Sequence, residues 1–507
     1  MLGVRAEADP DAELVRFPSG RRLGVGQLAD GARSVAARLA RLAPAGTRVA
    51  TCLPPGPEAV EVIFGLALLG AVEVPLALDV TQPAAAALLT ASGAGLVITA
   101  AGVLAANPGL AAAAGGRTML LTGAAPAAGR PLLAELAPGP LPARGPRPGD
   151  PLAIMSTSGT TGRSKGAVLP HFAALRHARR VRATMGYGAG DVLLNVFPWN
   201  HINVRHAALL PALLSGARLV ARPRFSASGF WDTCRAEGVT AFNFMGAMLA
   251  ILDRRPPGPD DTSHAVRLAY GGPAPRDLAL RFRERFGVTP LEAYACTELG
   301  DVAASTIGTW RPGTAGRVVP EYDVAILDEL GRALPPGETG QIAVRPRWRD
   351  ITFAGYAGDP EATAAAWRDG WFGTGDRGVL DADGYLSFAG RRADVVRRRG
   401  ENIATWDVEE AVRAMPGVLD VAALGVASEL TEQELLVVLE RAPGSRADGP
   451  AVHAWCRDKL PRHAVPRYVR VVNDLPRTPN GKVRKAALAQ AGVDRFTWDA
   501  KAAPPGR

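Results

Sequence analysis

A run of hydroxyl-bearing residues and glycines between positions 156 and 167 constrains this chain more than any other stretch. It reads Ser-Thr-Ser-Gly-Thr-Thr-Gly-Arg-Ser-Lys-Gly-Ala and follows the apolar segment 152–155. Glycines let backbone N–H groups approach an anion closely, hydroxyls donate further hydrogen bonds, and Lys165 adds a full positive charge. The stretch therefore predicts a loop that binds a polyphosphate.

The spacing of this loop differs from two better-known phosphate-binding motifs. A Walker loop requires Gly-x-x-x-x-Gly-Lys-Ser/Thr, whereas Lys165 lies three residues after Gly162 and precedes Gly166. A loose dinucleotide fingerprint occurs at 24–29, but no acidic residue follows it about 20 residues later. A flexible surface loop is the alternative interpretation of any Gly/Ser/Thr run. The density of the 157–162 core and the lysine favour phosphate binding.

Length and composition limit the class of protein. A chain of 507 residues exceeds one ordinary core, so roughly two to four folding units are expected. The net charge of +9 is dispersed, which favours anionic small substrates and argues against nucleic acid. The four cysteines form no Cys-x-x-Cys pair, the N-terminus lacks an apolar signal core, and the most hydrophobic window, 62–72, is too short for a membrane span. A cytoplasmic protein is expected.

The apolar pattern predicts an α/β fold with a large N-terminal part and a small C-terminal part. Helices are predicted at 25–42, 57–69 and 172–185, and strands at 48–53, 71–76, 94–99, 192–197, 240–248 and 289–293, the 240–248 strand running into a turn. A hairpin is predicted around 381–384. After 390–394 the pattern changes to a compact α+β unit, with helices at 406–415 and 449–460 and strands at 418–426, 434–439 and 468–472. The tail from Asp499 is expected to be disordered.

Several side chains outside the loop suit a nucleotide or a second substrate. His201 follows a predicted strand, where parallel sheets expose ligand edges, although a core histidine is the alternative. The segment 294–298 offers an aromatic face, a hydroxyl and a carboxylate that can bind magnesium. Asp376 can accept hydrogen bonds from two adjacent ribose hydroxyls. Lys482 follows an Asn-Gly turn, and an exposed tail lysine is its alternative interpretation.

Taken in order, these motifs resemble the adenylate-forming superfamily of acyl-CoA synthetases, luciferase-like enzymes and peptide-synthetase adenylation domains. The specific elements are 157–166, 294–298, 374–376, 390–391 with 400–403, and 476–482. The segment 224–231 looks like the crotonobetaine/carnitine-CoA ligase branch. The likeness covers nearly the whole chain. It implies a multi-layer N-terminal domain with twisted sheets at 1–391, a hinge at 392–393, and a mobile α+β C-terminal domain at 394–507.

The resemblance implies ATP-dependent activation of a carboxylic acid, with Mg²⁺, followed by transfer to coenzyme A. Lys482, Glu298, Thr161 and Lys165 are the implied catalytic residues, with Thr161 and Glu298 on the metal. The implied ATP-binding residues are Thr157, Ser158, Gly159, Thr160, Thr161, Gly162, Lys165, Gly272, Pro273, Ala274, Glu292, Tyr294, Ala295, Thr297, Asp376, Arg391 and Lys482. Arg399, Gly400, Glu401 and Asn402 lie on the coenzyme A side. A homodimer is a further expectation.

The acyl pocket is expected to be lined by Trp199, Asn200, His201, Asn243, Gly246, Ala247, Tyr270, Gly271 and the residues around 299–302, including Val302. Gly246 stands where many members of the superfamily carry proline, and several neighbours are small. No acidic residue occurs in the entrance segment 197–204, where amino-acid activators hold an ammonium group. These features predict a roomy pocket for a bulky, mainly apolar acid.

The chain departs from the superfamily pattern at a few positions. Ala393 stands where a Lys or Asp pivot is usual, so the second half-reaction is weakened or the pivot is shifted to Asp394. Ser164 replaces proline, Ala295 and Cys296 replace a Gly-Met type pair, and Glu292 replaces an Asn or Gln that meets the adenine amino group. Two alternatives therefore stay open: an enzyme that forms acyl-adenylates with little CoA ligation, and a catalytically silent nucleotide-binding regulator.

Overall fold

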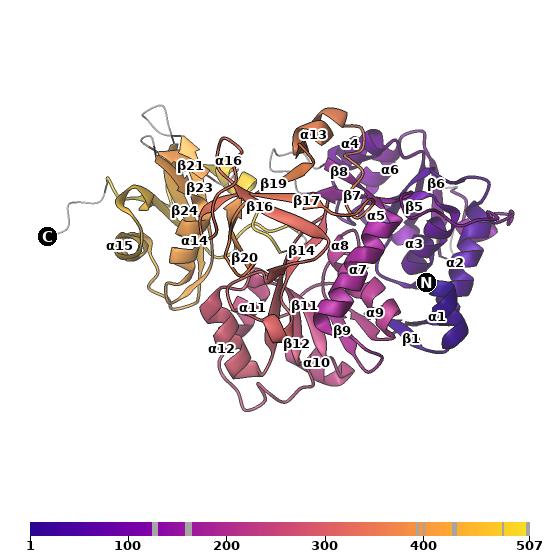
Figure 1. Cartoon of the computed structure of the whole chain (residues 1–507), viewed down its shortest axis with the longest axis horizontal. Helices are drawn as coiled ribbons and strands as arrows, with labels where there is room; N and C mark the ends of the chain where they lie inside the picture. The colour runs from indigo at the N-terminus through magenta and orange to yellow at the C-terminus, as the bar shows by residue number, and fades with distance from the viewer. Residues whose placement is uncertain are drawn as a thin grey trace.

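The computed structural model describes residues 1–123, 130–157, 165–391, 395–398, 401–427, 433–478 and 481–502. It confirms the predicted α/β class: a large N-terminal part with several sheets carries a small α+β unit at its C-terminal end (Figure 1). The predicted hinge, 392–393, lies outside the described residues.

The largest sheet positions the site. Its strands, in spatial order, are β15 (Arg317–Val318), β14 (Gly300–Ala304), β13 (Thr289–Cys296), β12 (Leu268–Gly272), β11 (Ala241–Met245), β9 (Val192–Asn195), β10 (Arg218–Ala221), β1 (Glu13–Arg16) and β2 (Arg22–Gly24). From β13 to β1 neighbouring strands are parallel, so the carboxyl ends of β9, β11, β12 and β13 open on one edge. The predicted acyl and nucleotide residues follow these ends.

A second sheet carries the phosphate loop. Its order is β6 (Thr118–Thr122), β5 (Leu96–Ala100), β3 (Arg48–Cys52), β4 (Val72–Pro75), β7 (Pro151–Thr157) and β8 (Lys165–Pro170). Strands β7 and β8 form an antiparallel pair in which Thr157 faces Lys165. The two ends of the predicted loop are therefore fixed by this hairpin, while 158–164 lie outside the described residues.

Helices pack on both sheets as their apolar spacing requires. The predicted helices are confirmed as α2 (Val25–Leu39), α3 (Pro57–Leu69) and α7 (His171–Met185). Proline at the first position of α3 and Gly70 in a left-handed conformation after it set its two ends. The other helices here are α1 (Leu2–Ala8), α4 (Gln82–Ser92), α5 (Ala101–Ala106), α6 (Pro108–Ala114), α8 (Ile202–Val204), α9 (Leu210–Ser215), α10 (Phe230–Glu237), α12 (Arg276–Phe286) and α13 (Pro360–Ala366), with a π-helix at Arg205–Leu209.

One predicted strand is partly wrong. The 240–248 stretch is predicted to be a strand running into a turn, but the strand ends at Met245 and the helix α11 (Gly246–Asp253) begins at once. The run Ala247-Met248-Leu249-Ala250 consists of good helix formers, which explains the helix. Conversely, β13 extends beyond the predicted 289–293 to Cys296.

A third sheet joins the two parts of the chain. It consists of β16 (Tyr322–Leu327), β17 (Thr339–Pro346), β18 (Trp367–Arg368), β19 (Trp371–Leu380) and β20 (Leu386–Arg391). The predicted hairpin connects β19 and β20: Oδ1 of Asp381 accepts hydrogen bonds from the amides of Asp383 and Tyr385, and Gly384 has a positive φ. Asp376 on β19 lies opposite Arg391 on β20.

The C-terminal unit lies at one end of the molecule, in orange and yellow (Figure 1). Its elements are β21 (Val395–Arg398), β22 (Glu401–Ala404), α14 (Thr405–Arg413), β23 (Val418–Ala427), β24 (Gln433–Arg441), α15 (Gly449–Lys459), β25 (Tyr468–Val472), α16 (Lys485–Ala491) and β26 (Thr497–Asp499). The predicted helices and strands of this unit are confirmed. The expected disorder from Asp499 is wrong for 499–502, because β26 pairs with β25 and Asp499 binds Arg467 at 2.9 Å.

No helix among the described residues is long and apolar enough to cross a membrane. The most hydrophobic window of the sequence lies largely within α3, whose Val60, Val62 and Leu66 are buried against other helices and strands.

Candidate active site

The phosphate loop is anchored next to a carboxylate. Nζ of Lys165, at the start of β8, lies 4.8 Å from the ring centre of Tyr356, within cation–π range. The hydroxyl of Tyr356 donates a 2.8 Å hydrogen bond to Oε1 of Glu298. The structure thus brings together a lysine and a glutamate that are far apart in the sequence. Thr157 is buried at the end of β7, whereas Ser158, Gly159, Thr160, Thr161 and Gly162 lie outside the described residues.

The carboxylate of Glu298 suits a metal ion that also binds the substrate. No group of three or more His, Cys, Asp or Glu side chains forms a metal cage in the part of the chain that the structure describes. Mg²⁺ is commonly held by one or two carboxylates together with substrate phosphates. Glu298, beside the phosphate-loop lysine, fits that arrangement.

Tyr294 and Asp376 meet directly although they come from different sheets. The Tyr294 hydroxyl donates a 2.7 Å hydrogen bond to Oδ2 of Asp376. Burial, reinforced by the Asp376 charge, raises the pKa of Tyr294 well above its usual value. The Tyr294 ring also stacks on Phe388, with ring centres 6.3 Å apart. The backbone of Arg391 pairs with Asp376, but the structure does not describe the Arg391 side chain.

Glu292 is held in a dry environment beside the predicted adenine segment. Its Oε2 accepts a 2.8 Å hydrogen bond from the amide of Ala274, which follows Gly272 and Pro273. Burial raises the pKa of Glu292 to about 8. Near neutral pH the side chain therefore carries a proton for much of the time. Ala295 is exposed and Thr297 is half-buried on the same segment.

The glycines of the predicted acyl pocket are explained by close packing. A Cβ on Gly246 would lie 2.4 Å from the carbonyl oxygen of Pro273, and one on Gly271 would lie 2.0 Å from that of Phe244. Real Cβ atoms do not approach a backbone oxygen so closely. Both positions therefore need glycine for the neighbouring backbone segments to pack this close together. The space beside Gly246 is filled by backbone, so this glycine by itself does not indicate a roomy pocket, and the size of the pocket stays a prediction. Ala247 is half-buried in the first turn of α11.

Polar side chains surround Asn243 and Tyr270. These residues are partners in the pairing of β11 with β12, and both are buried. The Tyr270 hydroxyl donates a 2.5 Å hydrogen bond to Oδ1 of Asp301, which also lies 3.2 Å from Nε2 of His177. Val302, the predicted pocket residue, follows Asp301 and is buried in the hydrophobic core that also contains Tyr294 and Leu299. The neighbourhood does not support the expected apolar acid.

Sequence reasoning missed His177, whereas Asp301 lies within the segment 299–302 that was expected around the acyl pocket, though no role was given to its carboxylate. Nothing in the sequence singles out His177, because α7 carries several other polar residues. Only the packing of α7 against β14 brings His177 to Asp301.

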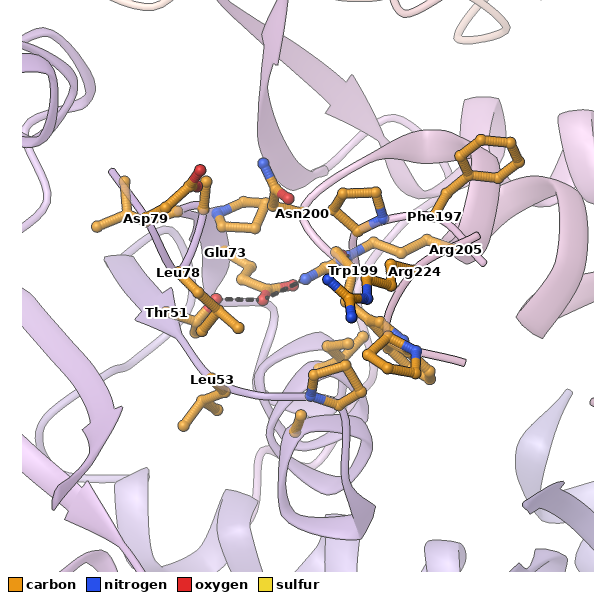
Figure 2. Close-up of a pocket in the computed structure, with 18 residues that line it drawn as sticks. Thr51, Leu53, Glu73, Leu78, Asp79, Phe197, Trp199, Asn200, Arg205 and Arg224 are labelled. Carbon is orange, nitrogen blue, oxygen red and sulfur yellow. Dashed lines mark hydrogen bonds and ion pairs between the residues drawn. The ribbon is translucent and has the colours of Figure 1, made fainter. Parts of the chain in front are cut away.

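A cavity of about 330 Å³ lies beside Trp199 and Asn200 (Figure 2). Its floor is the buried ion pair of Arg205 with Glu73, joined at 3.0 Å between Nη2 and Oε1, and the Thr51 hydroxyl donates to the same carboxylate at 2.5 Å. Of the predicted acyl residues only Trp199 and Asn200 line this cavity. The rest belong to the strand ends described above.

Lys482 of the C-terminal unit is close enough to the N-terminal part for its charge to act on His201. Burial, together with the positive charge of Lys482, lowers the pKa of His201 to about 4. Nδ1 of His201 accepts a hydrogen bond from the amide of Asn203, which fixes the ring. The C-terminal unit therefore presents its lysine to the strand end where His201 stands. The Glu401 and Asn402 backbones form β22, whereas their side chains, Arg399 and Gly400 lie outside the described residues.

Other charged groups also meet across the two parts. Burial lowers the pKa of Arg254, at the end of α11, while the carboxylate of Asp420 from β23 acts in the opposite direction. Burial raises the pKa of Asp407 on α14, and the Arg377 charge from β19 counteracts it. Charged groups of the two parts are therefore close enough to act on each other.

Comparison with known proteins matches this architecture to one family. The model of the AMP-binding enzyme family matches residues 2–357, and that of the AMP-binding enzyme C-terminal domain matches 407–482. A sulfoacetate–CoA ligase of Cupriavidus necator is 32% identical over 496 residues, covering 96% of each protein. A crotonobetaine/carnitine–CoA ligase of Salmonella typhimurium is 32% identical over 349 residues, covering 67% of this chain and 66% of the relative. The crystal structure of ATP-bound MatB from Rhodopseudomonas palustris superposes with a TM-score of 0.85 at 27% identity, covering 97% of this chain and 98% of the other.

Proposed function

The chain belongs to the AMP-binding enzyme family, and we propose which of its residues perform each step of the ligation of a carboxylic acid to coenzyme A. It is an ATP-dependent carboxylate–CoA ligase. A carboxylate oxygen attacks the α-phosphorus of ATP, the bond to the β-phosphate breaks, and pyrophosphate leaves. The thiol of coenzyme A then attacks the acyl carbon, AMP leaves, and the thioester forms.

The observation that supports the first step best is the effect of Lys482 on His201, whose pKa is lowered by burial and by the positive charge of this lysine. An ammonium group at this strand end can contact both the acid's carboxylate and the α-phosphate. Negative charge on the non-bridging oxygens must be stabilised in the transition state, and a positioned lysine does this in a site with little water. Neutral His201, whose Nδ1 is occupied by Asn203, offers its other nitrogen as a donor to the acid.

Tyr294 and Asp376 are proposed to hold the nucleoside. The ring of Tyr294 stacks on adenine beside Gly272, Pro273 and Ala274, while Asp376, with Arg391, accepts the ribose hydroxyls. The direct hydrogen bond between Tyr294 and Asp376 supports this assignment, because it keeps the base-binding and ribose-binding groups in register. Glu292 would receive the adenine amino group at the sheet edge.

The hairpin β7–β8 is proposed to hold the leaving pyrophosphate. Thr157, Ser158, Gly159, Thr160, Thr161, Gly162 and Lys165 would surround the β- and γ-phosphates. Mg²⁺ would be held by Glu298, Thr161 and phosphate oxygens, where it neutralises phosphate charge. Support comes from the Tyr356 side chain, which contacts both Lys165 and Glu298, so a metal held by Glu298 would lie beside phosphates held by Lys165.

The second step is proposed to need rotation of the C-terminal unit. In this proposal the N-terminal domain comprises 1–391, the hinge 392–393 and the mobile domain 394–507. The rotation would exchange Lys482 for Arg399, Gly400, Glu401 and Asn402 on the coenzyme A side. Ala393 at the hinge makes the rate of this step the quantity to measure.

Location and assembly are part of the proposal as well. Both ATP and coenzyme A are cytoplasmic metabolites, so we place the enzyme in the cytoplasm. We further propose a homodimer, which sedimentation or light scattering of the full chain would test.

The deciding experiment is a panel of carboxylic acids incubated with ATP and Mg²⁺, with and without coenzyme A. The products are separated as AMP, ADP, pyrophosphate, phosphate and acyl-CoA. Acid-dependent AMP and pyrophosphate, with acyl-CoA when the thiol is present, is the expected result. AMP and pyrophosphate without acyl-CoA would limit the enzyme to adenylation. ADP and phosphate would contradict the proposed chemistry.

A further inference from the structure

A group of buried polar side chains lies between the large sheet and the helices that cover it. We call His177, Asn203, Asn243, Tyr270 and Asp301 the inner polar cluster. Asp301 is 0% exposed, Asn243 1% and His177 3%. The charges and amides here are costly to bury unless each is hydrogen-bonded, so their partners can be counted.

Two acceptors of the cluster have no hydrogen-bond partner among the described residues. Asp301 uses Oδ1 for the Tyr270 hydroxyl and for Nε2 of His177, which leaves Oδ2 buried and without a donor there. Asn243 donates from Nδ2 to Oδ1 of Asn203 at 3.0 Å and to the carbonyl of Ala207 at 3.2 Å. Its own Oδ1 is buried and accepts no hydrogen bond from the described residues.

His177 turns Nε2 toward the Asp301 carboxylate, so a proton on Nε2 points at Oδ1. Its Nδ1 is also buried and lacks a partner in the part of the chain that the structure describes. The unmatched oxygen atoms of the inner polar cluster, Oδ2 of Asp301 and Oδ1 of Asn243, are both acceptors. What completes the cluster must donate hydrogen bonds.

The inner polar cluster is continuous with the predicted site of the acid. The amide of Asn203 donates to Nδ1 of His201, and Oδ1 of Asn203 accepts a hydrogen bond from Asn243, so His201 adjoins the cluster. The charge of Lys482 acts on His201 in turn. The His177 and His206 ring centres are 5.9 Å apart. Asn243 and Tyr270 belong both to the cluster and to the expected acyl lining. An acid whose carboxylate meets Lys482 therefore extends toward Asp301.

The charge around Asp301 favours a neutral donor over a cation. The guanidinium of Arg176 donates to the carbonyl of Asp301 at 2.9 Å and to the hydroxyl of Tyr322 at 3.0 Å. A positive charge thus already lies beside the carboxylate. A second cation brought by the substrate would be repelled at short range, since interactions between charges are strong in a dry site. A hydroxyl donates to Oδ2 without that repulsion.

We propose that the acid carries a hydroxyl group on its acyl chain and that Asp301 selects it by accepting a hydrogen bond at Oδ2. This inference rests on the proposed function, since it concerns the acid that is adenylated. It replaces the expected apolar acid with a polar one. The selectivity follows from the unmatched acceptors, because an acid without a donor leaves them buried and unpaired.

The test uses pairs of acids that differ only by a hydroxyl: butyrate with its 3- and 4-hydroxy derivatives, and benzoate with its hydroxy derivatives. The wild-type enzyme is assayed for acid-dependent pyrophosphate release, and kcat/KM is compared within each pair. A site built to bind a hydroxyl rejects the analogue lacking it by on the order of 10⁴-fold. A preference of that kind for one hydroxylated member is the expected result. Equal rates for both members of every pair would overturn the proposal and would mean that water occupies Oδ2. A preference for the matching amino acids over the hydroxy acids would overturn it as well.

A variant adds an independent readout. Asp301→Asn keeps the shape but replaces one acceptor by a donor, so the ratio of kcat/KM between the two members of the preferred pair should fall by about 10- to 100-fold. The exposed Asp232→Asn serves as the matched control and should keep the wild-type ratio. If the ratio of Asp301→Asn also stays at the wild-type value, Asp301 does not select the hydroxyl. Circular dichroism and ATP binding show whether the variant is folded.

The outcomes separate this inference from the proposed function. If no acid in the panel supports pyrophosphate release, the proposed function fails and the inference falls with it. If acids are adenylated but a hydroxyl gives no advantage, the function stands and only the role of Asp301 is rejected.

Discussion

The hydroxyl of Tyr294 on β13 donates a 2.7 Å hydrogen bond to Oδ2 of Asp376 on β19. The large sheet and the third sheet thus meet through two side chains that are 82 positions apart in the chain. A ligand that stacks on Tyr294 and binds Asp376 contacts both sheets at once.

Replacing Tyr294 by Phe should weaken ATP binding while leaving the stacking face in place. Loss of a hydrogen bond to a charged group at this position is expected to raise the KM for ATP about tenfold, with a smaller change in kcat. Steady-state kinetics at saturating acid measure both constants. Tyr385→Phe is the control, because the Tyr385 hydroxyl donates to the main-chain oxygen of Thr309 and not to a nucleotide-binding side chain. An unchanged KM in Tyr294→Phe would mean that Asp376 does not need Tyr294 to bind ribose.

Lys482→Ala should remove most of the first half-reaction. Loss of one positioned group that stabilises transition-state charge lowers rates by about 10²- to 10³-fold. Acid-dependent pyrophosphate release measures this step, and transfer of chemically prepared acyl-adenylate to coenzyme A measures the second. Only the first should fall. Lys459→Ala removes an exposed lysine from the same unit and should behave as wild type.

Glu292 should make folding stability depend on pH. Its pKa is about 8 in the folded protein and near 4.5 when the chain is unfolded. Since the folded form keeps the proton longer, the stabilising contribution is complete below pH 4.5 and is lost as the pH rises through about 8. Glu292→Gln, which never ionises, should lose less thermal stability than wild type as the pH rises through this window. Thermal unfolding at closely spaced pH values measures the difference; parallel curves for the two proteins would show that Glu292 ionises normally.

Gly246→Ala should destabilise the strand-end region. The new Cβ would lie 2.4 Å from the carbonyl oxygen of Pro273, so α11 or the 272–275 segment must move. Such overpacking costs about 1 to 3 kcal/mol and should raise the KM for the acid. Gly188→Ala is the matched control, because no neighbouring atom lies within 4 Å of the place that its Cβ would take. If both variants unfold at the wild-type temperature, the contact at Pro273 is easily relieved.

The ion pair between Arg205 and Glu73 should matter for folding stability mainly because each buried charge needs its partner. Glu73→Leu leaves a buried guanidinium without its counter-charge and is expected to cost about 3 to 5 kcal/mol, whereas Glu73→Leu with Arg205→Leu should cost less. Chemical denaturation followed by tryptophan fluorescence compares the three proteins, since Trp199 lies beside the pair. A double variant less stable than Glu73→Leu would contradict this account.

Much of the fold was predictable because local patterns agree with the final packing. The helix 57–69 begins at a proline and ends before Gly70, and the strand 468–472 is a run rich in β-branched residues ended by polar ones, so both were predicted with their correct bounds. The helix α11 was missed because the apolar run 241–252 fits a strand as well as a helix until the β11 register is known. The tail at 499 was missed because β26 forms only by pairing with β25, a contact that local sequence does not encode.

The site was predictable where chemistry sits in a motif and not where it depends on packing. Glu298, Tyr294, Asp376 and Lys482 were predicted from short motifs. In the structure Tyr294 and Asp376 are in direct contact, and Glu298 accepts a hydrogen bond from Tyr356 beside Lys165. His177 and its contact with Asp301 were missed, since their meeting requires α7 to lie against β14. The glycines at 246 and 271 were no guide to the size of the acyl pocket for the same reason, because the space beside them is occupied by main-chain atoms. The expected apolar character of the acid stays a prediction.

In the proposed function, strand β13 divides the two substrates between its faces. Glu292 and Tyr294 alternate with Leu291 along the strand, and Leu291 lies in register with Tyr270, and Tyr270 with Asn243, on the side of the inner polar cluster. Substitutions on the second face can therefore alter which acid is accepted while the ATP-binding face stays unchanged. Acid preference in a chain of this kind is free to diverge among descendants without any loss of the energy source that drives the reaction.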